Sequence, residues 1–385
     1  MNRVGPGAVR LGVIASSLNI SRNSLYYYVK DRRDLVQKCY LRTCDFIDDI
    51  LASEARSSDG FETKIRNMFR ALMSENACKF VIISDMALLE ASARKLVANR
   101  LDHQISKIAS LISDAQGEGT LRDVDPTIAA HMIMGMTEWA RTWNAWTSPD
   151  LSLQQRRNEM SAIALSEIVL RGIAASPEES FVCKLKFDDL NRSSYNLFDR
   201  ADANTQRRQI LIGAASRLFN ERGIESVSGD DIAAEVGVTK GAIYHHFRDK
   251  HALVLACYER AFDLYQLIND AASATQDDPL RKMLTVFHLN CQAQAVETPP
   301  LVMQPGLQSL PEITLVRARK LAVQMRSIHA DGVATGSLRH SDPALVEITA
   351  GAFFRLLKWR DRRPELSDER IADEMTSVFL RGMMA

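Results

Sequence analysis

The sequence predicts an all-α protein built from two similar halves. Glycine and proline are sparse, at 18 and 11 of 385 residues, as is usual where helices dominate. Apolar residues recur at helical spacing, most clearly at Leu211, Ala214, Ala215, Leu218 and Phe219, which form one stripe of an amphipathic helix. A block of the chain is also repeated. With 385 residues and 46% hydrophobic content, we expect two to four domains with large cores.

The repeat is long and free of gaps. Residues Asn2–Arg42 align with Asn220–Arg260 at an offset of 218, and 12 of the 41 positions are identical. A weaker echo follows, where Gly119–Pro126 (GTLRDVDP) matches Gly336–Pro343 (GSLRHSDP) at an offset of 217. A repeat of this length indicates a duplicated domain and not a solenoid unit. Each half is predicted to be a short head followed by a longer helical body.

We divide the chain into five parts on this basis. The linker contains SPEES and DDLNRSS and few signs of helical periodicity. The parts are a first head at 1–43, a first body at 44–174, a linker at 175–203, a second head at 204–262 and a second body at 263–385.

Charge and motifs narrow the function. The whole chain is neutral, but Met1–Arg42 holds eight Lys and Arg against two Asp and Glu, a net of 8 − 2 = +6. Such a segment faces nucleic acid or is an ordinary solvated face. No GxGxxG, Walker loop, GxSxG or HExxH motif occurs, so we expect no enzyme, and no CxxC pair suggests a metal or redox site. No apolar run approaches the roughly 18 residues of a membrane span, and we expect a cytoplasmic protein without cofactors.

In the second head we expect four helices in succession. The first begins at Asn204 or Thr205 and ends at Gly223. The second begins near Ser228, which has capping-box spacing with Asp231. The third begins at the N-cap Thr239, and a fourth follows. Two short helices joined by Gly-Val-Thr are a helix-turn-helix, whose second helix enters the DNA major groove.

The residues of that segment suit DNA. Lys240 can approach guanine acceptors or phosphate, and Gly241 and Ala242 are small enough for close approach. The polar ring tips of Tyr244, His245 and His246 can reach phosphate oxygens. Lys250 adds a positive charge beside the free N–H groups at the start of the next helix. The candidate contacts are Thr239, Lys240, Gly241, Ala242, Tyr244, His245, His246 and Lys250.

These residues carry a family resemblance. The run LFNERGIESVSGDDIAAEVGVTKGAIYHHFRDKHALV resembles the DNA-binding head of the TetR family of bacterial transcription regulators. The resemblance is strong from Asn204 to about Phe262 and clear from Asn2 to about Thr43, where SLYYYVKDRRDL is similar to the family pattern. It implies tandem TetR-like units, whose bodies are helical ligand-binding and dimerisation regions.

The resemblance also implies roles for single residues. Phosphate contacts are expected from Tyr244, His246 and Lys250, and in the first head from Tyr26, Tyr28 and Arg32. Base-reading positions are expected at Lys240, Gly241, Ala242 and His245, and at Arg22, Asn23, Ser24 and Tyr27, with Ser21 in the place of Thr239.

The first head departs from the pattern, because Met1 aligns with Phe219 and nearly all of the first helix is missing. Without it, the apolar side chains of Ile14, Leu18 and Leu25 should be exposed. Either the true start lies upstream or this head is degenerate, and we favour a start that is wrongly assigned or truncated.

A stripe of large side chains lies on the helix predicted after Pro126. It consists of Trp139, Trp143 and Trp146 at i, i+4 and i+7, and Met132 and Met136 share nearby faces. The candidate pocket residues are Met132, Met136, Trp139 and Trp143. Such a stripe forms either a core or helix–helix interface, or the wall of a ligand pocket.

We therefore expect a sequence-specific DNA-binding regulator, a repressor relieved by a small and partly apolar effector. The alternative is a regulator that binds a ligand or protein but not DNA. The predicted helices 126–145 and 154–172 can pair with 343–358 and 368–382 in a four-helix interface. That interface forms either within one chain, as an intramolecular pseudo-dimer, or between chains in a homo-oligomer. Because the two heads differ at nearly every base-facing position, a single-chain pseudo-dimer would read an asymmetric double-stranded DNA site.

Overall fold

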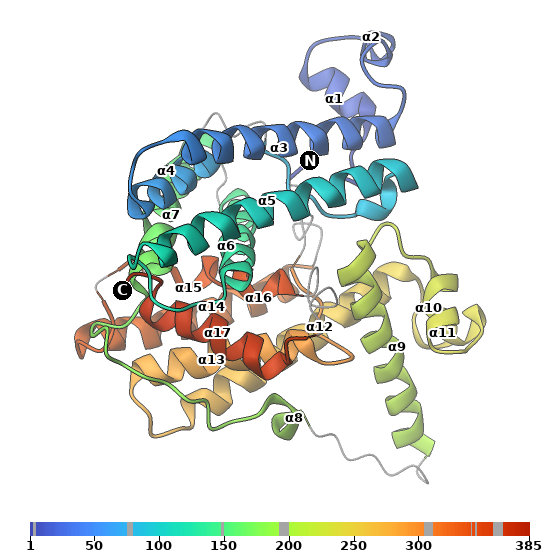
Figure 1. The fold of residues 1–385 in the computed structure, drawn as a ribbon. Helices are drawn as coiled ribbons and strands as arrows, with labels where there is room; N and C mark the ends of the chain where they lie inside the picture. The colour runs from blue at the N-terminus through green and yellow to red at the C-terminus, as the bar shows by residue number, and fades with distance from the viewer. Residues whose placement is uncertain are drawn as a thin grey trace.

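In the computed structural model the chain is all-α, as predicted (Figure 1). The structure describes residues 1–385 except 3–4, 75–79, 148–149, 192–199, 304–310, 340, 343–344 and 357–364. No β-strand occurs in these described residues, which hold only two isolated bridges, Leu121 with Met384 and Ala174 with Leu338.

The first half begins with two short helices and continues into longer ones. The helices are α1 (Leu11–Ser17), α2 (Arg22–Tyr26), α3 (Arg32–Arg56), α4 (Phe61–Met73), the 3-10 turn η2 (Met86–Leu88), α5 (Ala91–Gly117), α6 (Pro126–Thr147) and α7 (Leu151–Arg171). Helices α3 to α7 enclose a core that is dominated by aliphatic side chains and methionines, with Phe69 fully buried in it.

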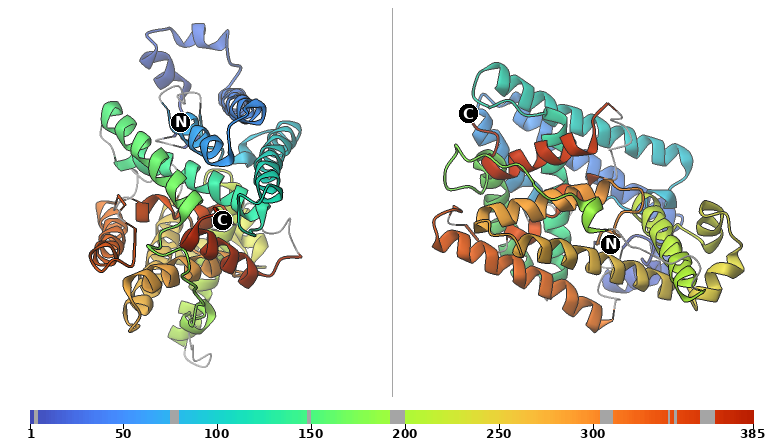
Figure 2. Two further views of the ribbon diagram at one scale, coloured as in Figure 1. Left: turned by 60° about the vertical axis from the view of Figure 1, so that its left-hand side comes forward. Right: turned by 90° about the horizontal axis from the view of Figure 1, so that it is seen from below.

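The second half repeats this order. Its helices are α9 (Arg200–Arg222), α10 (Gly229–Glu235), α11 (Lys240–His246), α12 (Lys250–Ser273), α13 (Pro279–Ala295), α14 (Glu312–Ala334), α15 (Leu345–Ile348), α16 (Gly351–Phe354) and α17 (Asp368–Arg381). The short α8 (Phe187–Leu190) precedes them and buries Phe187 against α12 and α13. Figures 1 and 2 show both pairs of short helices on the side of the molecule away from the C-terminus.

The sequence repeat is matched in backbone detail. Helices α1 and α10, α2 and α11, and α3 and α12 each begin 218 residues apart. Asp31 and Asp249 cap α3 and α12 in the same way, each accepting a hydrogen bond from the backbone N–H three residues on. Asn19 and Gly237, at equivalent positions after α1 and α10, both have left-handed backbones, with φ of 53° and 68°. The same local conformations therefore follow from the same local chemistry.

Two equivalent asparagines clamp equivalent extended segments. Asn2 donates to the Phe80 carbonyl at 3.0 Å and accepts from the Ile82 N–H at 3.0 Å. Asn220 donates to the Pro300 carbonyl at 3.0 Å and accepts from the Val302 N–H at 2.9 Å. Each head is thus tied to its own body by a long-range pair of hydrogen bonds.

The two halves meet through helices α6 and α7 of the first body and α15, α16 and α17 of the second. The segments that follow α7 and α17 form reciprocal backbone hydrogen bonds with the other half. The N–H of Ala174 donates to the Leu380 carbonyl at 3.0 Å, and that of Met384 donates to the Leu170 carbonyl at 3.0 Å. Likewise the N–H of Arg339 donates to Ile173 and that of Arg122 to Met383, at 2.9 and 3.0 Å. Contacts exchanged in this way are the mark of a two-fold, isologous interface.

Helices α6 and α16 cross at a pair of glycines. A methyl group on Gly135 would overlap the carbonyl oxygen of Gly351, and one on Gly351 would overlap the carbonyl oxygen of Gly135. Beside them, the Cβ atoms of Arg355 and Trp139 take equivalent places on the two sides. Backbones can approach this closely only without side chains, so the glycines determine the crossing.

Two details of the predicted organisation differ from the structure. Helix α9 begins at Arg200, not at Asn204 or Thr205, so the predicted linker 175–203 ends inside a helix. Helices α3 and α12 run without a break across the head–body boundaries placed at 43 and 262. Of the helix predicted over 343–358, the structure describes α15 and α16, while 343–344 and 357–358 lie outside the described residues.

Candidate nucleic-acid interface and ligand cavity

The second head contains a complete, well-capped helix-turn-helix. The Ser228 side chain accepts from the Asp231 N–H, and the Asp231 carboxylate accepts from the Ser228 N–H, which closes a capping box at the start of α10. Thr239 caps α11 by accepting from the Ala242 N–H. Ile232 and Ile243 pack the two helices into the core, beneath the first helix α9. The predicted motif is therefore present with its predicted caps.

The outer face of α11 is open to solvent. Gly241 has free space around it, since a methyl group there would contact only the Thr239 hydroxyl oxygen, at 3.8 Å. Thr239, Lys240, Gly241, Tyr244 and His245 are exposed, and Ala242 and His246 are half-buried. A flat, small-residue surface flanked by polar tips is suited to the major groove.

Lys240 is held by a neighbouring carboxylate. Its ammonium nitrogen lies 2.6 Å from an Asp230 carboxylate oxygen, and both side chains are at least half exposed. The hydrogen bond and charge of Asp230 raise the pKa of Lys240. Exposed pairs of this kind are weak, so the cation can be transferred to an acceptor on DNA at small cost.

Tyr244 and His246 lie on the two flanks of α11. The Tyr244 hydroxyl lies beside Gly229 at the N-terminus of α10, 3.1 Å from where a Gly229 Cβ would be. Burial lowers the pKa of His246, as do the charges of His245 and the α9 arginines 207 and 208. Both effects favour the neutral imidazole of His246, which can still donate or accept a hydrogen bond.

Lys250 and Arg32 take equivalent places in the two heads. The Lys250 ammonium lies 3.4 Å from the Glu225 carbonyl oxygen, and the Arg32 guanidinium donates to the Gly7 carbonyl oxygen. Gly7 and Glu225 are themselves equivalent, and they touch, because a Cβ on Gly7 would overlap the Glu225 side chain. Burial lowers the pKa of Lys250, against the charges of Glu225 and Asp85. Both predicted phosphate contacts therefore also fasten the loops at which the heads meet.

The first head presents a second helix-turn-helix surface. Ser21 caps α2 by accepting from the Ser24 N–H at 3.0 Å, as Thr239 caps α11. The Arg22 guanidinium lies 5.9 Å from the centroid of the Tyr26 ring. Arg22, Asn23, Tyr26, Tyr27, Tyr28 and Arg32 are exposed. The three tyrosines present their rings to solvent, with exposed fractions of 44%, 89% and 73%.

The expected exposure of the first head's apolar residues is correct only in part. Leu18 is 59% exposed, but Leu25 is buried and Ile14 is half-buried. Leu25 packs with Ala15 and Val29, and with Leu35 at the start of α3, in a small separate core. Ile243 and Leu253, the equivalents of Leu25 and Leu35, are likewise buried together in the second head, so contacts within the head account for the burial of Leu25.

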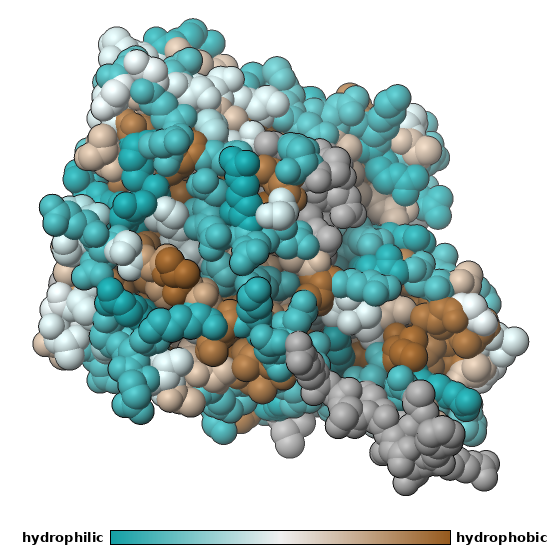
Figure 3. Space-filling model, turned by 60° about the horizontal axis from the view of Figure 1, so that its bottom comes forward, coloured by the Kyte–Doolittle hydropathy of each residue, from teal (hydrophilic) through white to brown (hydrophobic). Residues whose placement is uncertain are grey.

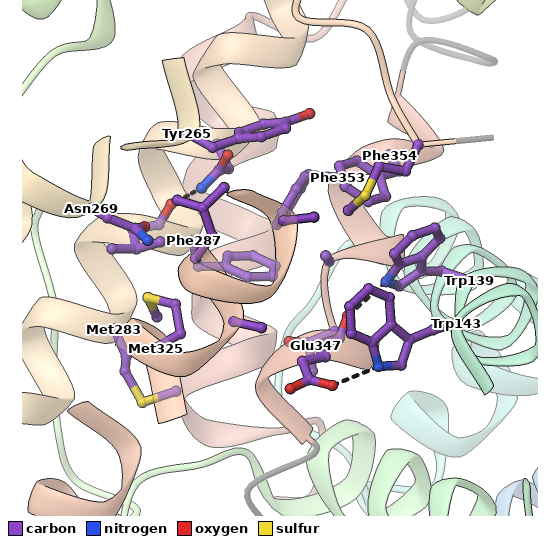
Figure 4. A pocket seen from close by; sticks show the side chains of 18 of the residues that line it. Trp139, Trp143, Tyr265, Asn269, Met283, Phe287, Met325, Glu347, Phe353 and Phe354 are labelled. Carbon is purple, nitrogen blue, oxygen red and sulfur yellow. Dashed lines mark hydrogen bonds between the residues drawn. The ribbon is translucent and has the colours of Figure 1, made fainter. Parts of the chain in front are cut away.

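An apolar cavity of about 130 Å³ lies in the second body (Figure 4). Helices α12, α13 and α14 line it with Phe262, Phe287 and Met325. The other half of the chain contributes Trp139 and Trp143 from α6. The cavity is therefore completed across the interface between the halves.

Glu347 lies buried at the wall of this cavity. Its carboxylate accepts from the Trp143 indole N–H at 2.5 Å, and its backbone carbonyl accepts from the Trp139 indole N–H at 2.6 Å. The Arg326 guanidinium pairs with the carboxylate from the solvent side. Burial raises the pKa of Glu347, and Arg326 opposes this. These contacts hold both indole rings at the wall of the cavity.

The predicted pocket residues divide into two groups. Trp139 and Trp143 line the cavity, but Met132 and Met136 do not, because they are fully buried in the main core. Because α6 is buried on almost every side, helical spacing alone does not show which half each side of the helix faces. The sequence reasoning missed Glu347 and the second-body aromatic residues. A buried-helix pattern with a lone glutamate, LVEI, was the available signal.

A larger cavity of about 550 Å³ lies between the first body and the second head. It is lined by the η2 segment, α5, α6, the end of α9 and α16. Trp139 and Phe354 line both cavities and contact each other edge to face, with ring centroids 5.0 Å apart. Asp85, with φ of 39°, lies at its rim against Gly223.

Other site types have no support in the described part of the chain. No group of three His, Cys, Asp or Glu side chains there is arranged to hold a metal ion. None of the helices described is long and apolar enough to cross a membrane. On the face that Figure 3 shows, hydrophilic side chains predominate and apolar ones form separate patches.

Two stretches of the chain match known protein families. The family described as "Bacterial regulatory proteins, tetR family" matches residues 211–257, and "Tetracyclin repressor-like, C-terminal domain" matches residues 54–146. The first match covers the second helix-turn-helix and the second covers the first body. The matches therefore come from both halves.

Individual relatives match smaller or larger parts. The chain is 26% identical over 200 residues to the HTH-type transcriptional repressor KstR2 of Mycolicibacterium smegmatis, covering 48% of this chain and 94% of the relative. It is 41% identical over 70 residues to the transposon Tn10 TetC protein of Escherichia coli, which is 18% of this chain and 34% of the relative.

Solved structures match about half of this chain, with low TM-scores. The ketosteroid transcriptional regulator KstR2 of Mycobacterium tuberculosis has a TM-score of 0.40 at 19% identity, covering 50% of this chain and all of that one. Apo AibR has a TM-score of 0.37 at 23% identity, with 46% of this chain covered and 99% of the other. The helix-turn-helix and the two sequence matches assign TetR-family domains to residues 211–257 and 54–146 of this chain.

Proposed function

We propose that this chain is a sequence-specific DNA-binding transcriptional regulator that works as an intramolecular pseudo-dimer. The observation that carries the proposal is the second helix-turn-helix, complete with caps and with an open face on α11. The first head repeats its caps and its exposed recognition helix. A DNA-binding regulator needs no catalytic group, and its place is the cytoplasm.

Internal pairing is supported by two independent features. The hydrogen bonds between the halves are reciprocal, as in a two-fold dimer of TetR-like units. In addition, a relative matched over 94% of its own length accounts for only 48% of this chain. One chain then supplies both heads of the usual pair. Because α2 and α11 carry different side chains, its site on DNA has two unlike halves.

The apolar cavity is the proposed effector site. At about 130 Å³ it is close to the roughly 150 Å³ of an engineered apolar cavity that binds benzene. The effector is therefore small and mainly apolar, unless the methionines 283, 303 and 325 move to enlarge the space. Asn290 lines the cavity, and its buried side-chain oxygen has no hydrogen-bond partner among the residues that the structure describes. An effector with one hydroxyl or N–H donor would satisfy it.

Helix α12 links this cavity to the DNA-binding surface. It begins at Lys250, shortly after α11 ends at His246, and it lines the cavity with Phe262 and Tyr265. At 1.5 Å per residue the two functions lie about 20 Å apart on one rigid element. An effector that favours a different packing of α12 would shift the spacing of the heads, and DNA affinity would fall through a population shift. Repression relieved by the effector is the expected sign.

The proposal is tested by selecting DNA from a random duplex pool with the full chain at two salt concentrations. An asymmetric two-part site supports a pseudo-dimer that uses both heads. A palindrome would mean that two chains pair and only the second head reads DNA. If no sequence is enriched at either salt concentration, the DNA-binding proposal fails, and the chain regulates through ligand or protein binding alone.

A further inference from the structure

The crossing of α6 and α16 is symmetric in backbone but not in chemistry. A Cβ atom added to either Gly135 or Gly351 would overlap the carbonyl oxygen of the other glycine. Beside them, Trp139 and Arg355 occupy equivalent places. Both pairs are separated by 216 residues (351 − 135 and 355 − 139). On the same register, Glu138 is equivalent to Phe354 (354 − 138). The two halves therefore present different residues at corresponding positions of one interface.

Each side of the crossing makes one specific contact. On one side the Arg355 guanidinium pairs with the Glu138 carboxylate, and the two side chains are only 7% and 11% exposed. On the other side the Phe354 ring meets the Trp139 ring edge to face, with centroids 5.0 Å apart. Pseudo-symmetry exchanges these two contacts, so a buried ion pair corresponds to an aromatic pair.

We infer that this asymmetry selects pairing between unlike halves and excludes pairing between like halves. If two first halves met in this register, Glu138 of each would face Trp139 of the other, and both buried carboxylates would lose the Arg355 guanidinium. If two second halves met, Arg355 of each would face Phe354 of the other, without a carboxylate. Leaving one member of a buried ion pair without its partner is strongly destabilising.

The partner that this surface accepts is therefore the complementary half, normally that of the same chain. The inference deepens the proposed pseudo-dimer and rests on it. It also explains why a chain with two similar dimerisation surfaces would not pair with itself through like halves. The covalent connection between the halves favours the internal partner, because it raises the effective concentration.

Charge-exchange variants of the full chain test the inference. Glu138→Arg leaves two guanidinium groups at the contact, and Arg355→Glu leaves two carboxylates. Each should lower the unfolding midpoint by roughly 10 °C. The double variant Glu138→Arg/Arg355→Glu restores an ion pair in reverse and should regain most of the loss. If the double variant loses as much as both single variants together, the pair carries no selectivity.

Mixing the two single variants gives the sharper readout. The arginine introduced by Glu138→Arg in one chain can pair with the glutamate introduced by Arg355→Glu in the other. The unchanged Arg355 of the first chain can pair with the unchanged Glu138 of the second, so two restored ion pairs hold a swapped 1:1 heterodimer. Light scattering should then find about 86 kDa, twice the 43.1 kDa chain, in the mixture but not for the parent or the double variant. Single variants that keep the parent's midpoint and stay monomeric when mixed would overturn the inference.

The outcome is separable from that of the proposed function. A parent protein that is itself a clean species of about 86 kDa, twice the 43.1 kDa chain, would refute pairing within one chain. The unfolding midpoints of the two single variants and the double variant would still decide the selectivity, because each ion pair would then join Glu138 of one chain to Arg355 of the other. If the single variants do not fold at all, recovery of folded protein by the double variant takes the place of the midpoint.

Discussion

The glycine crossing provides a quantitative test of how the halves are joined. In most helix positions Gly→Ala stabilises, by up to about 1 kcal/mol, because alanine has less freedom to lose on folding. At Gly135 the new methyl group would overlap the Gly351 carbonyl oxygen and lie 2.9 Å from the Arg355 Cβ atom. Since backbone cannot rotate away as a side chain can, the helices must separate. Overpacking of this kind costs about 1–3 kcal/mol.

The variant Gly135→Ala should therefore lower the thermal unfolding midpoint by several degrees, at roughly 2–4 °C per kcal/mol. The matched control is Gly117→Ala, at the end of α5, where a methyl group meets nothing within 4 Å. Thermal unfolding followed by circular dichroism should show a lower midpoint than the parent's for Gly135→Ala and a higher one for Gly117→Ala. If Gly135→Ala is as stable as Gly117→Ala, then α6 and α16 do not cross as described, and the internal pairing loses its main structural support.

The DNA-binding surface, the cavity and one buried histidine each provide a further test. Lys240→Ala should change which DNA sequence is preferred, and a selected site identical to the parent's would remove Lys240 from the base-reading set. Tyr244→Phe and Lys250→Ala should instead weaken binding to all sequences, and Lys250→Ala should lower the slope of affinity against salt by about one charge. Ala318→Phe should fill the proposed effector cavity, so titration with toluene should no longer change tryptophan fluorescence, while DNA affinity stays at the parent level. Burial lowers the pKa of His288, and the nearby Asp373 carboxylate opposes this but is 65% exposed. Below about pH 6.5 the unfolded state then binds more protons, so stability should fall as the pH drops from there, and His288→Gln should remove that slope.

Local features of the heads could be predicted from the sequence because they depend on near neighbours. The caps Ser228, Thr239 and Asp249 each bond a backbone N–H three residues on, so type and spacing suffice to identify them. The same holds for the equivalent Ser21 and Asp31. The predicted start of α9 is wrong, because Arg200 to Ala203 are already helical ahead of both candidate caps.

Contacts between distant parts of the chain could not be predicted in this way. The burial of Leu25 depends on Leu35 in a helix whose direction is set by the body, and the sequence pattern near Leu25 does not contain it. Trp139 and Trp143 stand out as a stripe in the sequence, but whether they form an interface or a pocket wall depends on what faces them. They do both, because α6 crosses into the second half and meets Glu347 about 200 residues away.

The sequence by itself therefore determined the helical class, the duplication and the position of the helix-turn-helix, since each is written in local periodicity, caps and repeated text. The tertiary structure decided which surfaces meet. It brought Gly135 against Gly351 and Glu138 against Arg355, and it formed one cavity from residues of both halves. Such pairings are set by the packing of whole helices, which depends on side-chain shape summed over an interface and not on any local pattern.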